Sequence, residues 1–336
     1  MSTERLPGDY LIKVLLVRLG ALGDIIHAVP VAAAIRRAFP QAAIDWLVDV
    51  RHRDAVELVS VVDGAIGVNT ISARSLSSVV RQLRGTRYSV AFDLQGLLKS
   101  AILARVSGAA RVVGFPADLL RERAARAFYS ETAGDALPHV IDKNLSMLKA
   151  IGVRMPQIEF PLEDRNPHIV VEARSRLGIT DKSPFAILNP AAAWPNKRWP
   201  PVYFAEVARG LAKRQMMPSL VLWGPGEEAL AQAVVDASDG TATLSPKTEI
   251  VDLVSLIKAA ALMISGDTGP MHIAAAVGTP VVILMQHHPM FNCYIPPGER
   301  HRVVAAQTIG EIGVEHAYQA ARAAFTTERA SSLFSA

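Results

Sequence analysis

The chain has 336 residues, half of them hydrophobic and a fifth charged, a balance that excludes intrinsic disorder and allows two domains, each with its own core. Its formal net charge is +4, with arginines spread along the chain, and without a nucleic-acid-binding module or aromatic–basic interleaving this charge does not indicate a nucleic-acid partner. No apolar run reaches the roughly 18 residues of a membrane span and the N-terminus has no signal-peptide core, so we expect a cytoplasmic protein.

Short apolar runs alternate with helical periods, which is the pattern of βαβ units and parallel sheets. In the first half we expect strands at residues 13–19, 44–48, 90–94 and 112–115, and helices that include 30–39 and 99–106. Residues 152–168 hold three prolines and no periodic pattern, which predicts a linker. In the second half we expect strands at 185–188, 220–223, 262–265 and 281–285, and helices at 202–214, 227–237, 251–260 and 312–324. The sequence therefore predicts an α/β protein with two similar halves.

Ligands of open parallel sheets lie beyond the carboxyl ends of the strands, so the strand-to-helix turns are the candidate sites. The first turn, residues 18–27, reads RLGALGDIIH. Gly20 and Gly23 permit a tight turn, but their spacing is not the G-x-G-x-x-G of dinucleotide binding. Asp24 either caps the following helix or acts as a general base toward an acceptor hydroxyl. We interpret His27, one turn further on, as structural.

A second turn, residues 265–276, reads SGDTGPMHIAAA. Asp267 or Thr268 can cap the helix, Gly269 lets a ligand approach, and Pro270 suits the first helical turn. The free N–H groups and the positive end of the helix dipole predict an anion site, with a diphosphate as its natural occupant.

Two further turns of the second half have open interpretations. In the loop 189–200, Lys197 and Arg198 stand between Trp194 and Trp199, which fits either binding of an anion or ring or a surface loop with packed tryptophans. Glu227 either accepts hydrogen bonds from ribose or sugar hydroxyls or favours a helix N-terminus.

In the first half, the cations Lys99, Arg121, Arg123 and Arg126 either meet an anionic acceptor or form a solvated helix face. The sequence contains no D-x-D, no phosphate loop of the G-x-x-x-x-G-K-[ST] type, no H-E-x-x-H and no G-x-S-x-G. A diphosphate leaving group would therefore be neutralised by cationic side chains and a helix N-terminus.

The G-x-x-G-D-x-x-x-x-x-P segment from Gly20 to Pro30 and the D-T-G-x-x-H-x-A-A-A segment from Asp267 to Ala276 resemble the family-9 glycosyltransferases, the heptosyltransferases of lipopolysaccharide inner-core assembly. Asp93-Leu94-Gln95-Gly96-Leu97-Leu98-Lys99-Ser100 resembles their type I branch. The resemblance implies a GT-B fold, two Rossmann-like domains facing across a cleft. It also implies inverting transfer of L-glycero-D-manno-heptose from ADP-heptose to the Kdo of Kdo2-lipid A, with no metal or other cofactor.

The resemblance also implies roles for single residues. Asp24 would be the base, and Lys197 would offset charge on the diphosphate. The donor would be held by Gly23, Lys197, Glu227, Asp267, Thr268, Gly269 and His272, and the anionic acceptor by Lys99, Arg121 and Arg123. Residues 1–160 would bind the acceptor and 168–310 the nucleotide sugar, and a C-terminal helix within 311–336 would pack back toward the first domain. Peripheral contact with the inner membrane is a further hypothesis.

The chain departs from the family where a Gly-Pro-Thr-type turn is usual, because residues 285–290 read MQHHPM. That loop would lie near the donor sugar or nucleotide, so the departure concerns the identity of the transferred sugar and of the nucleotide base. The alternatives to the type I activity are a related transferase with another donor or acceptor, a sugar-nucleotide epimerase and a non-catalytic sugar-nucleotide-binding module. A nicotinamide oxidoreductase is disfavoured because G-x-G-x-x-G is missing.

Overall fold

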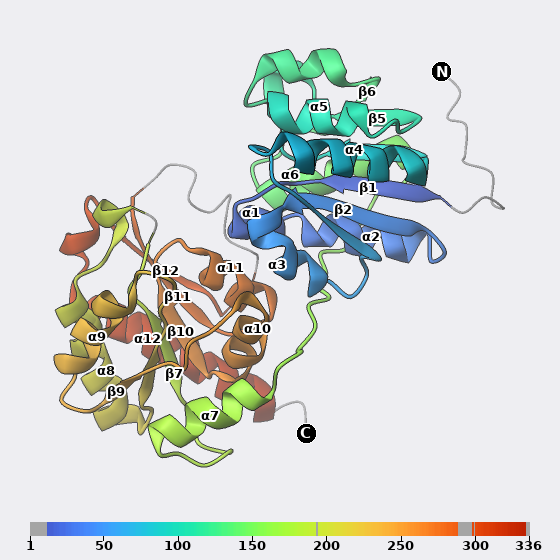
Figure 1. The fold of residues 1–336 in the computed structure, drawn as a ribbon. Coiled ribbons are helices and arrows are strands. Elements are labelled where there is room, and N and C mark those ends of the chain that lie inside the picture. The colour runs from blue at the N-terminus through green and yellow to red at the C-terminus, as the bar shows by residue number, and fades with distance from the viewer. Residues whose placement is uncertain (1–11, 193, 288–297, 299, 334–336) are drawn as a thin grey trace. The chain divides into compact units, whose positions relative to one another are not determined.

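The computed structural model describes residues 12–192, 194–287, 298 and 300–333, without the side chains of residues 73 and 327–333. The chain divides into two compact units, one that ends at Glu163 and one that begins at Asp164. The division falls inside the predicted linker. Each unit is a parallel sheet covered by helices on both faces (Figure 1).

The sheet of the first unit has the strand order β3-β2-β1-β4-β5-β6, with every pairing parallel. Its strands are β1 (Lys13–Val17), β2 (Ala43–Asp49), β3 (Gly64–Val68), β4 (Val90–Asp93), β5 (Arg111–Gly114) and β6 (Glu131–Thr132). Alternate side chains of β1 point to opposite faces, so Leu16 belongs to one core cluster and Leu15 to another. The sheet is therefore buried on both faces, as parallel sheets are.

The helices of the first unit are α1 (Leu22–Ile26), α2 (Val29–Ala38), α3 (Arg53–Glu57), α4 (Ala73–Thr86), α5 (Leu98–Val106) and α6 (Val140–Ser146). Short 3-10 turns lie at η1 (Val50–His52), η2 (Ala117–Leu119), η3 (Arg123–Phe128) and η4 (Met147–Ile151). Residues of α2, α6 and η4 share a core with Leu16, Trp46 and Phe92. Residues of α4, α5 and η3 share the other core with Leu15 and Val17.

The second sheet has the order β12-β11-β10-β7-β8-β9, again parallel. Its strands are β7 (Ala186–Asn189), β8 (Ser219–Val221), β9 (Ala242–Leu244), β10 (Leu262–Ser265), β11 (Val281–Gln286) and β12 (Arg302–Ala306). Its helices are α7 (His168–Leu177), α8 (Pro201–Gln215), α9 (Glu228–Asp236), α10 (Ile250–Ala259), α11 (Gly269–Ala276) and α12 (Val314–Leu333), with 3-10 turns η5 (Pro195–Lys197) and η7 (Ile309–Glu311).

The last helix, α12, packs on α8 and on β10, β11 and the edge strand β12 of the second sheet. Its residues Ala317, Tyr318 and Ala321 are buried in the same core as Phe204 and Leu211 of α8. The expectation that the end of the chain also packs toward the first domain stays a prediction, as do the binding roles of the two domains.

All eight predicted strands are present, and their ends differ from the prediction by no more than two residues. The α/β prediction is confirmed. The strands that the sequence did not predict, β3, β6, β9 and β12, are the four edge strands of the two sheets.

Candidate functional site

The turn after β1 holds Asp24 in an ion pair with Arg18. Nη2 of Arg18 lies 2.5 Å from Oδ2 of Asp24, and Nη1 donates to the carbonyl oxygen of Leu94 at 2.5 Å. The same Asp24 oxygen accepts from the N–H of Ala21 at 3.3 Å. The Arg18 side chain is buried at 5% exposure, whereas that of Asp24 is 22% exposed. Asp24 thus supports the start of α1 and still presents its carboxylate to solvent, so the cap and the base are compatible roles.

Burial of Arg18 has an electrostatic consequence. Burial lowers the pKa of its guanidinium, and the adjacent Asp24 carboxylate opposes that shift. Arg121 is close enough to lower the pKa of Arg18 further. Because an arginine stays protonated, the negative charge of Asp24 has a permanent counter-charge. The sequence reasoning missed Arg18, although an arginine at the carboxyl end of an apolar strand was a visible signal.

The other residues of this turn are packed closely. A Cβ added at Gly20 would lie 2.9 Å from Cδ2 of His52, so the His52 ring packs closely on the glycine backbone here. Gly23 lies at the second position of α1 and is partly exposed. His27 is buried, and its carbonyl oxygen accepts from Nδ2 of Asn144 at 3.3 Å, in line with its structural interpretation.

The three predicted acceptor cations lie in adjoining segments. Lys99 is at the second position of α5. Arg123 is the first residue of η3, and Arg121 lies two residues before it, on the other side of Glu122. All three cations are exposed. The N–H of Glu122 donates to the carbonyl oxygen of Gly96 at 3.3 Å, and a Glu122 carboxylate oxygen accepts from the N–H of Leu98 at 2.6 Å. The structure therefore brings the segment of Arg121 and Arg123 against the start of α5.

Lys143 of α6 joins this cationic group. Its ammonium donates to the carbonyl oxygen of Leu119 at 3.0 Å and lies 4.7 Å from the ring centre of Phe115. Burial lowers its pKa, and Arg121 and Arg18 lower it further. The cations Arg18, Arg121 and Lys143, from three parts of the first unit, thus lie close enough together for their charges to lower the pKa of Arg18 and of Lys143.

Asp93, the last residue of β4, has a structural role beneath these cations. One carboxylate oxygen accepts from the N–H groups of Gln95 and Gly96 at 2.9 and 3.3 Å. The other accepts from the hydroxyls of Ser100 and Tyr129 at 2.9 and 2.7 Å. Asp93 is fully buried, and burial raises its pKa. It anchors α5 and the end of η3 to the sheet.

In the second unit, the turn after β10 is organised by neutral hydrogen bonds. Nδ2 of the buried Asn189 donates to the hydroxyl oxygens of Ser265 and Thr268 at 3.1 and 3.0 Å, and these two oxygens are 3.0 Å apart. Thr268 is the N-cap of α11, but its side chain makes no capping hydrogen bond. Gly269 and Pro270 begin the helix. Thr268 therefore shapes the turn through Asn189 and Ser265 without capping the first N–H groups.

Asp267 links two of the predicted donor ligands. Its Oδ1 lies 3.1 Å from Nε2 of His272, and its Oδ2 lies 3.8 Å from Nζ of Lys197. The Lys197 side chain is 47% exposed and that of Asp267 is 39% exposed. The structure thus brings Lys197, Asp267 and His272 together. The long separation between Lys197 and Asp267 leaves the ammonium able to turn to a bound anion.

Glu227 and the two tryptophans behave differently from one another. Glu227 accepts from the N–H of Gly224 at 2.9 Å, so it organises its own turn. Trp199 is buried, and its Nε1 donates to the carbonyl oxygen of Ile312 at 3.0 Å, whereas Trp194 is 66% exposed. One tryptophan of the loop is therefore a packing residue and the other faces solvent.

The loop in which the chain departs from the family lies largely outside the described residues. Of residues 286–290, only Gln286 and His287 are described.

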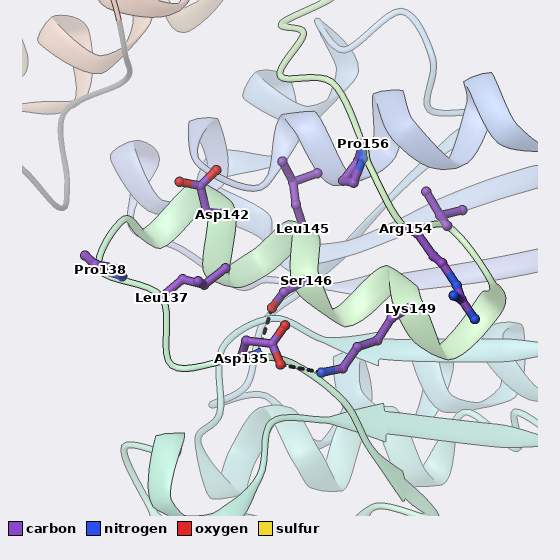
Figure 2. Close-up of a pocket in the computed structure, with 10 residues that line it drawn as sticks. Asp135, Leu137, Pro138, Asp142, Leu145, Ser146, Lys149, Arg154 and Pro156 are labelled. Atoms are coloured by element: carbon purple, nitrogen blue, oxygen red, sulfur yellow. Dashed lines mark hydrogen bonds and ion pairs between the residues drawn. The ribbon is translucent and has the colours of Figure 1, made fainter. Parts of the chain in front are cut away.

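A hollow of about 730 Å³ lies elsewhere in the first unit, along α6, η4 and the segment that follows them (Figure 2). Asp135 there forms an ion pair with Lys149, and its N–H donates to the Ser146 hydroxyl at 2.9 Å. None of the predicted site residues lines this hollow. Over the described residues, no three His, Cys, Asp or Glu side chains gather as metal ligands would, and no helix is long and apolar enough to cross a membrane.

Comparison with known sequences gives a consistent result. Residues 76–311 match the model of glycosyltransferase family 9 (heptosyltransferase). Lipopolysaccharide heptosyltransferase 1 of Pseudomonas aeruginosa is 25% identical over 283 residues, which are 81% of this chain and 78% of the relative. Lipopolysaccharide heptosyltransferases 3 and 2 of Escherichia coli K12 are 25% and 24% identical. Identity alone therefore does not separate the three numbered types.

Solved structures share the fold. A family 9 glycosyl transferase from Veillonella parvula is 22% identical with a TM-score of 0.84, over 94% of this chain and 97% of that one. The Escherichia coli heptosyltransferase WaaC with ADP-2-deoxy-2-fluoro heptose is 22% identical with a TM-score of 0.77, over 95% of this chain and 100% of that one. These likenesses confirm the predicted fold class, α/β of the GT-B type.

Proposed function

The chain belongs to glycosyltransferase family 9 (heptosyltransferase), and from this premise we propose that it transfers L-glycero-D-manno-heptose from ADP-heptose to the Kdo of Kdo2-lipid A, with inversion and without a metal. The proposal is carried by the partly exposed carboxylate of Asp24 in its ion pair with Arg18. The reaction needs a base for the acceptor and charge stabilisation for the departing ADP.

Asp24 serves as the base in this proposal. The acceptor hydroxyl oxygen attacks the anomeric carbon of heptose, its proton passes to the Asp24 carboxylate, and the bond from that carbon to the phosphate oxygen breaks. Attack opposite the leaving group inverts the configuration. Arg18 holds the carboxylate in place through its 2.5 Å contact. A positioned carboxylate of this kind typically contributes about 10²–10⁴ in rate.

The turn at the start of α11 serves the leaving group. Lys197 neutralises charge on the diphosphate, while Thr268 and Gly269 bring the N–H groups of α11 to its oxygens. Asp267 and His272 orient these groups through the contacts at 3.8 and 3.1 Å. Glu227 contacts the sugar or ribose hydroxyls, and Gly23 approaches the donor from its own turn.

An anionic acceptor suits the cations of the first unit. The Kdo carboxylate pairs with Lys99, Arg121 and Arg123, in the neighbourhood of Arg18 and Lys143. The type I assignment is supported by this cationic group and by the relatives named lipopolysaccharide heptosyltransferase 1. Since the acceptor is lipid-linked, contact with a membrane surface belongs to the same proposal.

The test is ADP release from ADP-heptose in the presence of a chelator, with Kdo2-lipid A and with an acceptor that already carries a heptose, compared in parallel. Release that needs Kdo2-lipid A supports the proposal. Release with the heptosylated acceptor alone contradicts the type I assignment, and donor conversion without any acceptor indicates an epimerase. Donor binding without any turnover indicates a non-catalytic module.

A further inference from the structure

The exposed side of α5 combines apolar and cationic side chains. Leu98 and Ile102 are 37% and 38% exposed. Arg105, one turn beyond Ile102, continues the same stripe, because residues three and four apart share a helix face. Lys99 lies beside Leu98 and is also exposed. Exposed leucine and isoleucine next to cations are the composition of a surface that lies on a bilayer.

The segment 121–127 extends this surface. It packs against α5, and Glu122 accepts from the N–H of Leu98 at 2.6 Å. Arg121, Arg123 and Arg126 are exposed along it, together with two alanines. We call α5 and residues 121–127 the α5–η3 face. It carries five cationic side chains and one acidic side chain, an excess of four positive charges. This excess equals the formal net charge of +4 of the entire chain. Asp118, just outside it, is the nearest further acid in sequence.

The α5–η3 face is a preformed platform. Ala101 and Leu103 of α5 and Ala125 of η3 are buried in one core cluster with Tyr129. Beneath them, the Asp93 carboxylate accepts from the hydroxyls of Ser100 and Tyr129. The two segments are thus fixed to the sheet, so little ordering is needed when a flat partner is bound. The opposite side of the sheet is covered by α2, α6 and η4.

We propose that the α5–η3 face rests on the surface of an anionic lipid bilayer, with the side chains of Leu98 and Ile102 inserted at the headgroup level. The negative potential of such a surface attracts arginine and lysine side chains. The inference rests on the proposed function in one respect. Lys99, Arg121 and Arg123 belong both to this face and to the proposed acceptor site, so a lipid-linked acceptor would reach Asp24 along the bilayer that the face contacts.

The test is cosedimentation of the full chain with vesicles of phosphatidylcholine, with and without phosphatidylglycerol, over a range of NaCl concentrations. We expect binding only to the anionic vesicles, weakening as salt rises. Arg105→Gln combined with Arg126→Gln leaves the proposed acceptor cations intact and should weaken partitioning about thirtyfold. Leu98→Gln combined with Ile102→Gln should weaken it severalfold with little change in its salt dependence.

The matched control is Arg154→Gln combined with Met155→Ser. These two residues follow η4, on the other side of the sheet, and Met155 is 93% exposed. We expect this variant to bind like the unaltered chain. Absence of binding to anionic vesicles, equal binding by the Arg105/Arg126 variant, or an equal loss in the control would each overturn the proposal.

An activity measurement separates this inference from the proposed function. The Arg105/Arg126 variant should transfer heptose to a water-soluble Kdo acceptor at the normal rate and to vesicle-embedded Kdo2-lipid A more slowly. If the unaltered chain transfers heptose to neither acceptor, the proposed function fails, while the vesicle assay still decides whether the α5–η3 face binds lipid.

Discussion

The two strand-to-helix turns that carry the candidate site are held by different forces. After β1, the buried Arg18 lies 2.5 Å from Asp24, so this carboxylate has a fixed counter-charge. After β10, Asn189, Ser265 and Thr268 are joined by uncharged hydrogen bonds, and Lys197 lies 3.8 Å from Asp267. The first turn fixes the position of an anion of the protein, whereas the second leaves a cation available for an anion from outside.

The helices that follow these two turns also differ in how well their N-termini suit an anionic ligand. Helix α1 has five residues, too few for a strong dipole, and Asp24 lies in its first turn. Helix α11 has eight residues and no acidic residue in its first turn, and it buries Met271, Ile273 and Ala274 against the sheet. A base needs no helix dipole, but a diphosphate gains from one. The comparison predicts that the two turns respond differently to substitution.

The largest effect is expected for Asp24→Asn. Asparagine keeps an oxygen that can accept from the N–H of Ala21 but cannot take a proton from the acceptor. Turnover should fall about 10²–10⁴-fold, with donor affinity unchanged, in an assay of ADP release alongside donor binding by calorimetry. Near-normal turnover would return Asp24 to a capping role.

The control for this change addresses folding. Asp24→Asn leaves the buried guanidinium of Arg18 without its counter-charge, which is costly for stability. Arg18→Gln added to Asp24→Asn removes both charges and should restore much of the lost free energy of unfolding, measured with urea. Turnover should stay low in the double variant. Recovery of turnover together with stability would mean that Asp24 acts only through the fold.

Lys197→Ala should have the next largest effect, on both donor affinity and rate. Its side chain is 47% exposed and its ammonium lies 3.8 Å from Asp267, so we expect it to contact the diphosphate both before and during reaction. Loss of a charged hydrogen bond costs about 1.5–3 kcal/mol, or roughly ten- to hundredfold in affinity. Asn196→Ala changes a neighbouring exposed side chain in the same loop and should leave both quantities unchanged. Unaltered donor affinity in Lys197→Ala would contradict the assignment.

Asn189→Ala tests the uncharged network and should have a smaller effect. Ser265 and Thr268 lose a shared buried donor, and the start of α11 loses its support. Donor affinity should fall about tenfold, with near-normal turnover at saturating donor. Ser238→Ala removes a different buried hydrogen-bond donor of the second unit, a hydroxyl that donates to the carbonyl oxygen of Val235. That control should lower stability without lowering donor affinity; an equal loss of affinity in both variants would make Asn189 merely structural.

The strands could be predicted where both faces of the sheet are covered. All four residues of β4, β7 and β10 are buried, and such strands are continuous apolar runs. The edge strands are different, because β12 has one buried residue among its five and β6 has none. Their apolar residues are few or only partly buried, as in β12 (RVVAA), and pairing with a neighbouring strand defines them.

The site divides in a similar way. Asp24, Asp267 and Thr268 stand in glycine-containing turns after apolar strands, so local sequence was enough to single them out. Lys143 and Asn189 gain their roles from residues far along the chain: Lys143 from Leu119 and Arg121, Asn189 from Ser265 and Thr268. No local pattern contains such contacts. Arg18 is intermediate, since its position was visible but the direction of its side chain was not.

The smallest predicted effect concerns acid stability, where the two units again differ. In the second unit, burial lowers the pKa of His301 from 6.5 to about 4, with Arg300 and Arg302 adding to the shift. As pH falls below 6.5, the His301 side chain is therefore protonated in the unfolded chain before it is protonated in the folded chain. The stability that the neutral histidine contributes is fully present above pH 6.5 and is lost as pH falls to about 4. Asp93 of the first unit has a raised pKa, so its contribution to stability has the opposite sign and is lost as pH rises through that pKa.

With Trp46→Phe, the remaining tryptophans all lie in the second unit, so tryptophan fluorescence reports only the unfolding of that unit. Its free energy of unfolding in urea should fall by about 1 kcal/mol between pH 6.5 and 5.5. His301→Gln should remove that slope; an unchanged slope would assign the acid sensitivity of the second unit to another group.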